Sequence, residues 1–243
     1  MTQDTDQYQG LLPLRYSEIS NSINLACTRY HREREDVNLL AVSKGHSADS
    51  IKQLYALGQR QFGESYLNES QDKQQQLSSL DICWHFIGRI QSNKTANIAR
   101  DFAWVHSVDR LKIAKRLNDQ RPSEKPALNI FLQVNIDEET SKAGIKREEL
   151  FELAHAIIEL PKIKLRGLMA LPQRHEDFDR QRQSFARLRE LQEQTRDNLT
   201  IDKTDTLCLD CLSMGMSNDF EAAIAEQSTH LRIGSALFGP RST

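Results

Sequence analysis

Cysteine is scarce in this chain, with four in 243 residues, at positions 27, 83, 208 and 211. Four scattered thiols are too few for a disulfide scaffold. Cys208 and Cys211 form a C-x-x-C pair, but they fall in an apolar run that is typical of a strand, where positions three apart face opposite sides. A redox or metal pair needs converging sulfurs, so we predict no redox pair and no metal ligands.

Long hydrophobic runs and an excess of basic residues are also lacking. No apolar run approaches the length that spans a bilayer, and the polar, acidic residues 1–7 are unlike a secretory signal. A net charge of −2 provides no global basic field to attract nucleic acid. We therefore expect a soluble, cytoplasmic protein without nucleic-acid or membrane partners.

Several common catalytic signatures are missing as well. The sequence has no H-E-x-x-H, Walker loop, G-x-G-x-x-G or nucleophile elbow. Metal-assisted hydrolysis, NTP hydrolysis and dinucleotide use therefore have no support from motifs.

Short β-favouring apolar runs do recur along the chain, separated by amphipathic segments. The runs cover residues 39–43, 61–63, 82–87, 102–106, 128–134, 163–169, 207–213 and 230–233. The amphipathic segments include 47–57, 111–117, 148–160, 178–191 and 218–225. Alternating strands and helices pair in parallel through right-handed crossovers, and eight such units close a TIM barrel. The predicted fold class is α/β, as a single (β/α)8 TIM barrel.

The predicted barrel occupies residues 38–240 and follows a helical extension over residues 1–37. The helical pattern at 14–34 could plug the bottom of the barrel. The polar segment 119–126 is the obvious linker candidate, but strand–helix alternation continues across it. We therefore interpret it as a loop inside one domain of residues 1–243.

Lys44 ends the apolar run 38–43, at the mouth of a buried strand, where α/β proteins keep their ligands. Apolar surroundings disfavour an ammonium, so such a lysine is more often a free nucleophile. It could form a Schiff base with an aldehyde such as pyridoxal phosphate. The alternative is a lysine that ends an edge strand and points into water.

The loops after the seventh and eighth runs have phosphate-binding character, as these loops often do in TIM barrels. Ser217 can begin a helix and offer its hydroxyl and free N–H groups to an anion. Gly234 and Ser235 can present unobstructed backbone N–H groups, and Arg232 adds a fixed positive charge. Taken separately, Ser217 could be an ordinary N-cap, Gly234 a turn glycine and Arg232 part of a surface ion pair. Together, opposite Lys44, they favour a phosphate site.

Other polar residues at expected strand ends could line the same mouth or be satisfied buried groups: Glu64, His85, Ser107, Asp109 and Asn135. For His85 and His106 we favour a core role, because the sequence shows no partner for either.

The longest of these motifs resemble the pyridoxal phosphate homeostasis protein family, also called the proline synthetase co-transcribed homolog family. The resemblance runs in order from about residue 39 to 240. Its motifs are Ala-Val-Ser-Lys at 41–44, Phe-Gly-Glu at 62–64, Trp-His-Phe-Ile-Gly at 84–88, Val-His-Ser-Val-Asp-Arg at 105–110, Arg-Gly-Leu-Met-Ala-Leu-Pro at 166–172, and the segments 213–217 and 232–234.

The resemblance implies a barrel similar to the N-terminal domain of alanine racemase, the fold type III of pyridoxal phosphate proteins. Lys44 matches the lysine that forms the internal aldimine with pyridoxal 5'-phosphate. Ser217, Gly234 and Ser235 match the phosphate cradle, and Arg232 matches the arginine beside the pyridine nitrogen.

The chain departs from the family pattern at three places. Ser65 stands where members often have asparagine, His46 where a second lysine is common, and Gln227 where glycine is usual. These departures concern fine contacts and affinity, and they leave the aldimine lysine untouched.

A fold type III racemase carries a second, β-rich domain with a tyrosine for the far face of the cofactor, whereas here only residues 240–243 follow the barrel pattern. Two-sided proton transfer needs an acid or base on each face, and Lys44 provides one. A guanidinium at Arg232 disfavours protonation of the pyridine nitrogen, which weakens the ring as an electron sink. We therefore predict a protein without catalytic residues that holds the cofactor as its lysine aldimine and supplies apoenzymes. The barrel pattern shows no obvious extra apolar surface, so we expect a monomer.

Two alternatives stay open. One is an amino-acid racemase or lyase of the alanine racemase type, which would need a far-face residue such as Tyr66 or His85. The other is a cofactor-free TIM-barrel aldolase or sugar-phosphate isomerase that uses Lys44 with the phosphate loops.

Overall fold

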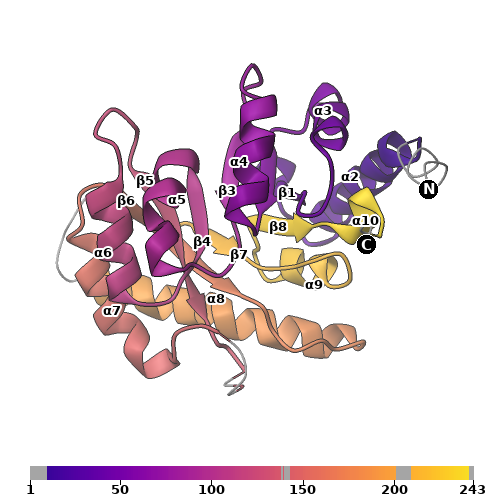
Figure 1. Cartoon of the computed structure of the whole chain (residues 1–243). Coiled ribbons are helices and arrows are strands. Elements are labelled where there is room, and N and C mark those ends of the chain that lie inside the picture. Colours follow the sequence, from indigo (N-terminus) through magenta and orange to yellow (C-terminus); the bar gives the residue numbers. More distant parts are fainter. Residues whose placement is uncertain (1–9, 138, 140–142, 201–208, 241–243) are drawn as a thin grey trace.

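The computed structural model describes residues 10–137, 139, 143–200 and 209–240. Within these residues, eight strands pair in parallel, each with the next along the chain, and β8 pairs with β1 to close a barrel (Figure 1). The strands are β1 (Asn38–Val42), β2 (Gln61–Glu64), β3 (Cys83–Phe86), β4 (Trp104–Val108), β5 (Leu128–Val134), β6 (Ile163–Ala170), β7 (Cys211–Ser213) and β8 (His230–Ile233). The predicted α/β TIM barrel is confirmed.

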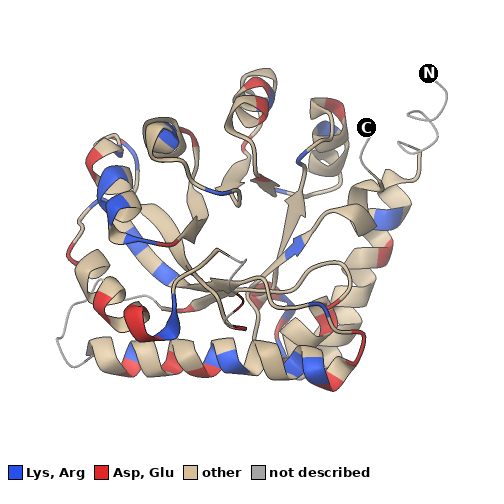
Figure 2. Ribbon diagram, turned by 60° about the horizontal axis from the view of Figure 1, so that its bottom comes forward, with Lys and Arg blue, Asp and Glu red and all other residues tan. Residues whose placement is uncertain are grey.

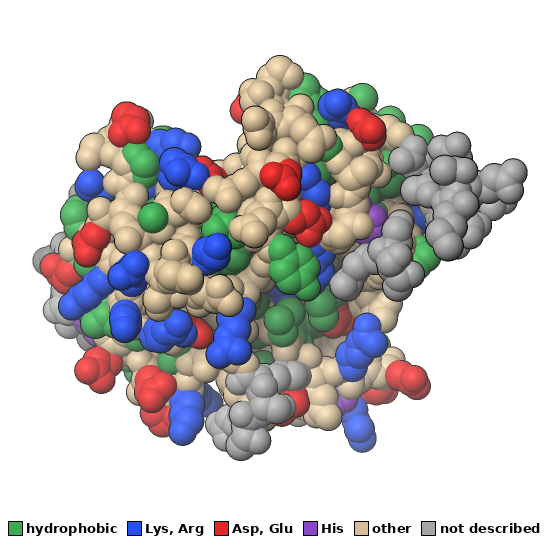
Figure 3. Space-filling view, in the orientation of Figure 1, with side chains coloured by type: hydrophobic (Ala, Val, Ile, Leu, Met, Phe, Trp, Pro, Cys, Tyr) green, Lys and Arg blue, Asp and Glu red, His purple; other side chains and the backbone are tan. Residues whose placement is uncertain are grey.

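Helices follow the strands and form an outer layer. They are α2 (Leu12–Arg29), α3 (Ala48–Ala56), α4 (Leu67–Gln76), α5 (Thr95–Asp101), α6 (Leu111–Gln120), α7 (Leu150–Ile158), α8 (Phe178–Thr200), α9 (Phe220–Ala225) and α10 (Ser235–Phe238), with 3-10 turns η1 (Arg34–Asp36), η2 (Ser92–Lys94) and η3 (Arg147–Glu149). Figure 2 shows these helices around the strands, with acidic and basic residues along their outer faces. Charges of both signs are interspersed on the face seen in Figure 3.

Each of the eight expected apolar runs overlaps a strand, and β5 and β8 have the predicted bounds. β7 is shorter than expected, because Leu209 and Asp210 precede the strand. Residues 201–208 lie outside the described part of the chain, and with them Cys208 of the C-x-x-C pair.

The N-terminal helix α2 does not plug the bottom of the barrel, which corrects our expectation. It packs on the outside, against α3, α9 and α10, and buries Leu12, Ile23, Ala26 and Cys27. The segment after β8 provides only the short helix α10, so α2 fills the outer layer between the helices that follow β1 and β7 (Figure 1). Helical periodicity predicts an apolar face but not the surface that this face covers.

The interior of the barrel is filled by side chains with rings or sulfur, which meet across it from strands β3 to β8. They are the buried His85, His106, Phe131, Met169, Cys211 and His230, with the partly buried Trp104 packed against them. Burial lowers the pKa of all three imidazoles, that of His230 to about 3. The histidines are therefore neutral at physiological pH, which avoids the cost of a buried charge. Their core role agrees with the interpretation favoured for His85 and His106.

In the described part of the chain, none of the helices combines the length and the apolar character needed to cross a bilayer.

Candidate functional site

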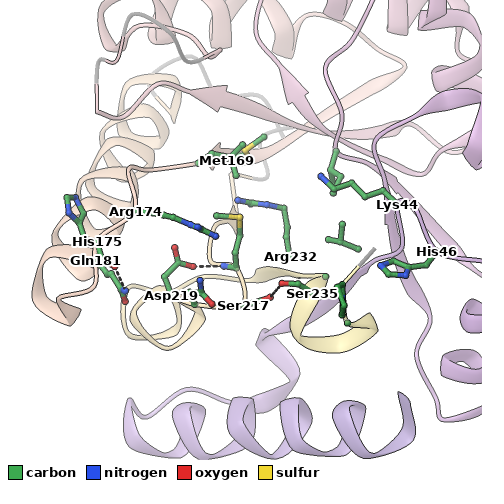
Figure 4. A pocket seen from close by; sticks show the side chains of 18 of the residues that line it. Lys44, His46, Met169, Arg174, His175, Gln181, Ser217, Asp219, Arg232 and Ser235 are labelled. Atoms are coloured by element: carbon green, nitrogen blue, oxygen red, sulfur yellow. Dashed lines mark hydrogen bonds between the residues drawn. The ribbon is translucent and has the colours of Figure 1, made fainter. Parts of the chain in front are cut away.

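A cavity of about 1030 Å³ opens at the carboxyl ends of the strands. It is lined by residues from the segments that follow β1, β6, β7 and β8. All five residues predicted for the cofactor site line it: Lys44, Ser217, Arg232, Gly234 and Ser235. Figure 4 shows Lys44, Ser217, Arg232 and Ser235 around the cavity. The structure thus brings them into one space, and their role as cofactor contacts stays a prediction.

Lys44 reaches the cavity because β1 ends two residues before it. The chain then turns at Gly45, whose φ of +76° favours glycine. Ser47 caps α3 by accepting a hydrogen bond from the N–H of Ser50 at 3.2 Å. The half-buried side chain of Lys44 extends toward the cavity from this turn (Figure 4).

A group of small donors faces Lys44 from the loops after β7 and β8. The hydroxyls of Ser217 and Ser235 are 3.5 Å apart, and the N–H of Ala236 points to Ser217 Oγ at 3.4 Å. Gly215 lets the β7 loop pack closely, since its φ is +92° and a Cβ there would lie 2.6 Å from that of Ala223. Two hydroxyls beside a backbone N–H can bind a phosphate or another anion.

Arg232 is a buried cation between the cavity and the barrel interior. Its Nη1 donates to Ser213 Oγ at 2.6 Å and its Nη2 to the carbonyl of Ala170 at 2.9 Å. Burial lowers the pKa of Arg232 to about 10, and the negative charge of Asp219 opposes that shift. The guanidinium is therefore charged at physiological pH.

The hydrogen bonds of Arg232 continue into the barrel. Ser213 Oγ, which accepts from Arg232, also lies 2.8 Å from Nδ1 of His106, and Nε2 of His106 lies 2.9 Å from Nδ1 of His85. Burial holds the pKa of both imidazoles well below its usual range, so both rings are neutral, and of the two nitrogens that face each other one donates and the other accepts.

Sequence reasoning missed several side chains of the cavity. Arg174, on the loop after β6, points into it, His175 lies at its edge, and Asp219 is near enough to Arg174 and Arg232 for both charges to lower its pKa against the effect of burial (Figure 4). Arg174 and His175 could have been identified from their place after the sixth strand, because the loops that follow the strands of a TIM barrel open at the same rim. His46, which replaces a common family lysine, also lines the cavity and stacks on Phe238 with ring centroids 4.7 Å apart.

The other polar residues at strand ends do not line this cavity. Glu64 and His85 are fully buried away from it, and Asn135 bonds to the backbone of Glu139. Tyr66, the other far-face candidate of the racemase alternative, is 60% exposed and lies outside the cavity.

A family model described as "Alanine racemase, N-terminal domain" matches residues 21–242. The chain is 50% identical over 225 residues to the pyridoxal phosphate homeostasis protein of Pseudomonas aeruginosa, covering 93% of this chain and 94% of that protein. The solved structure of PipY from Synechococcus elongatus with PLP bound is 34% identical, with a TM-score of 0.78 over 88% of this chain and 98% of that one. The alanine racemase of Corynebacterium glutamicum, at 15% identity and a TM-score of 0.66, covers 91% of this chain and 61% of its own, and shares the fold. The chain belongs to the pyridoxal phosphate homeostasis protein family, whose barrel is that of the alanine racemase N-terminal domain.

Proposed function

We propose that this protein binds pyridoxal 5'-phosphate (PLP) and takes part in PLP homeostasis, without substantial catalytic turnover. The relative of 50% identity carries the homeostasis name, and the PipY structure contains PLP. The observation that carries the proposal is that the amine of Lys44 and the hydroxyls of Ser217 and Ser235 line the same cavity.

The residues of the cavity fit the chemistry of this cofactor. PLP supplies an aldehyde, which condenses with a primary amine to a C=N bond and releases one water. Lys44 would provide the amine, and Ser217, Ser235 and the backbone at Gly234 would hold the phosphate. Arg232, buried against Ser213, would hold a fixed positive charge beside the pyridine nitrogen.

Holding the cofactor is favoured over turnover by two features of the cavity. A charged Arg232 opposes protonation of the ring nitrogen, so a carbanion on the ring would gain little stabilisation. Racemisation also needs an acid or base on the face opposite Lys44, and both candidates for it, Tyr66 and His85, lie elsewhere. Among described residues of the cavity, His175 and His46 are the imidazoles that a racemase would have to use.

We further propose that the protein acts as a monomer in the cytoplasm and passes the cofactor to PLP-dependent apoenzymes. The cavity opens at the rim of the barrel, so a cofactor held there would be within reach of a recipient protein. A transfer assay measures this directly. Loaded protein should activate an apoenzyme while the free aldehyde stays low, and a rate equal to that of spontaneous PLP release would contradict directed transfer.

The binding proposal is tested by visible absorption. Wild-type protein mixed with PLP should develop an absorption band of the C=N bond, Lys44→Ala should abolish it, and Lys115→Ala on the exposed face of α6 should keep it. A wild-type protein that develops no band would overturn the proposal and favour a cofactor-free lysine enzyme.

Incubation of loaded protein with single enantiomers of alanine separates a carrier from a racemase. The carrier proposal predicts no exchange of the α-proton on the timescale of seconds. Racemisation that is lost in both Lys44→Ala and His175→Ala would establish the racemase instead.

A further inference from the structure

A buried ion cluster lies directly beside the end of β1. Lys73, on α4, is only 5% exposed, and its ammonium donates to Ser43 O at 2.8 Å, Glu64 Oε1 at 2.8 Å and Glu69 Oε1 at 2.6 Å. Three acceptors use all three N–H groups of the ammonium. Glu64 Oε1 also accepts from the hydroxyl of Ser43 at 2.6 Å. We name Glu64, Glu69 and Lys73 the brace.

The brace contacts the chain on both sides of Lys44. The carbonyl of Ser43, which accepts from Lys73, belongs to the peptide group that precedes Lys44. The N–H of Gly45, which donates to Glu69 Oε1 at 2.6 Å, belongs to the peptide group that follows it. Two peptide planes flank each Cα and define its φ and ψ. Fixing both planes therefore fixes the direction in which the Lys44 side chain leaves the backbone.

An ion pair that only joins β2 to α4 would not have this arrangement. The bond between Glu64 and Lys73 is sufficient to link those two elements. Two further bonds instead reach residues 43 and 45, which precede α3 and belong to neither element. The pair of Glu64 and Lys73 is nearly dry, because their side chains are 0% and 6% exposed, whereas the Glu69 side chain is 29% exposed and lies at the edge of the brace. Water therefore competes little for the bonds that join Glu64, Lys73 and Ser43.

We propose that Glu64, Glu69 and Lys73 are positioning residues, which hold the backbone of Lys44 so that its amine meets the aldehyde carbon of PLP. This inference rests on the proposed function. The brace does not touch the cofactor and acts only through the peptide groups of residues 43–45. Misplacement of a reacting group by about 1 Å can cost about 100-fold in rate, so the effect should appear in the rate of bond formation rather than in the filling of the cavity.

The experiment compares two ligands on the same variants. PLP can form the bond to Lys44, whereas pyridoxine 5'-phosphate has the same ring and phosphate but no aldehyde. Glu69→Ala removes the acceptor of the Gly45 N–H, Glu69→Gln restores a neutral acceptor of the same length, and Asp72→Ala removes an exposed carboxylate from the same helix as a control. The double variant Glu64→Gln with Lys73→Met replaces the buried pair by neutral groups of similar size, so that the fold is kept.

For Glu69→Ala and for the double variant, we expect the absorption band with PLP to form about 10- to 100-fold more slowly than in the wild type. Their affinity for pyridoxine 5'-phosphate should change less than about 2-fold, and Glu69→Gln should recover much of the rate. Asp72→Ala should behave like the wild type with both ligands.

Three results would overturn the inference. Unchanged rates with PLP would show that the brace does not position Lys44. An equal loss for both ligands, with a lower unfolding temperature, would show that it only supports the fold. A wild-type protein that forms no band but binds pyridoxine 5'-phosphate would remove the covalent step on which the inference rests, while binding of neither ligand would refute the proposed function itself.

Discussion

Lys73 and Arg232 are both buried cations near the rim of the barrel, but their charges are compensated differently. Lys73 lies within 2.8 Å of carboxylate oxygens of Glu64 and Glu69. Arg232 donates to a hydroxyl and a carbonyl, and in the described part of the chain no carboxylate lies within ion-pair distance of it. Asp219 acts on it only from farther away.

The presence or absence of a paired carboxylate distinguishes a cation that stabilises the fold, Lys73, from a cation that can bind an anionic ligand, Arg232. A buried charge without a counter-ion is costly, and the lowered pKa of Arg232, about 10, reflects this cost. Lys73 is already neutralised by its neighbours, whereas Arg232 borders a cavity that an anion can enter. PLP is such an anion, so the cavity gains a counter-charge when it is filled.

The largest effect on the free energy of unfolding is expected from replacing Lys73, the cation that is paired with carboxylates. Lys73→Met removes one partner of a buried pair and leaves Glu64 with the Ser43 hydroxyl alone, so we expect a loss of about 3–5 kcal/mol in the free energy of unfolding. Chemical denaturation of the wild type and the variant measures this difference. Adding Glu64→Gln should recover most of the loss, because no unpaired charge is then buried.

The loss in Lys73→Met should also depend on pH. Burial raises the pKa of Glu64 already in the wild type, where Lys73 opposes the shift. Without Lys73 the folded-state pKa rises further above that of the unfolded chain, so Glu64 takes up a proton as the pH falls and the penalty shrinks. A variant as unstable at pH 5 as at pH 8 would contradict this account.

The three histidines inside the barrel are neutral in the folded protein, so we expect the free energy of unfolding to fall at acidic pH. Burial lowers the pKa of His230 in the folded protein to about 3, from the 6.5 of an unperturbed histidine. It therefore takes up a proton on unfolding between these values, and its contribution to stability is lost as the pH falls below 6.5, by about 1.4 kcal/mol per pH unit. His230→Phe should flatten the fall in unfolding free energy between pH 6.5 and 4.5 by about 2.3 kcal/mol in total. An unchanged slope would mean that His230 is not the group responsible.

The sequence was sufficient to predict the barrel and the position of Lys44. Apolar runs of the right length, separated by helical patterns, determine a parallel closed sheet, and its geometry alone brings residues 44, 217 and 234 to one rim. The outer location of α2 was not predictable, because periodicity describes a face and not its partner.

The brace could not be found in the sequence for a different reason. Glu64, Glu69 and Lys73 are charged residues in and around a polar helix, and α4 has only a weak apolar face. The same pattern is typical of a solvated helix surface. The contacts on which the proposed role rests become visible only in the structure, where Nζ of Lys73 lies 2.8 Å from the carbonyl oxygen of Ser43.

Arg232→Met should have the smallest effect on stability, and it tests the comparison most directly. The change removes two hydrogen bonds but also removes a buried charge that no described carboxylate neutralises, so the free energy of unfolding should change by about 1 kcal/mol or less in either direction. Affinity for PLP should nevertheless fall about 10- to 100-fold, because a charge-assisted bond of about 1.5–3 kcal/mol is lost. Denaturation without ligand and titration with pyridoxine 5'-phosphate measure the two effects separately. If Arg232→Met destabilises the empty protein as strongly as Lys73→Met does, Arg232 is a structural cation and the distinction between the two fails.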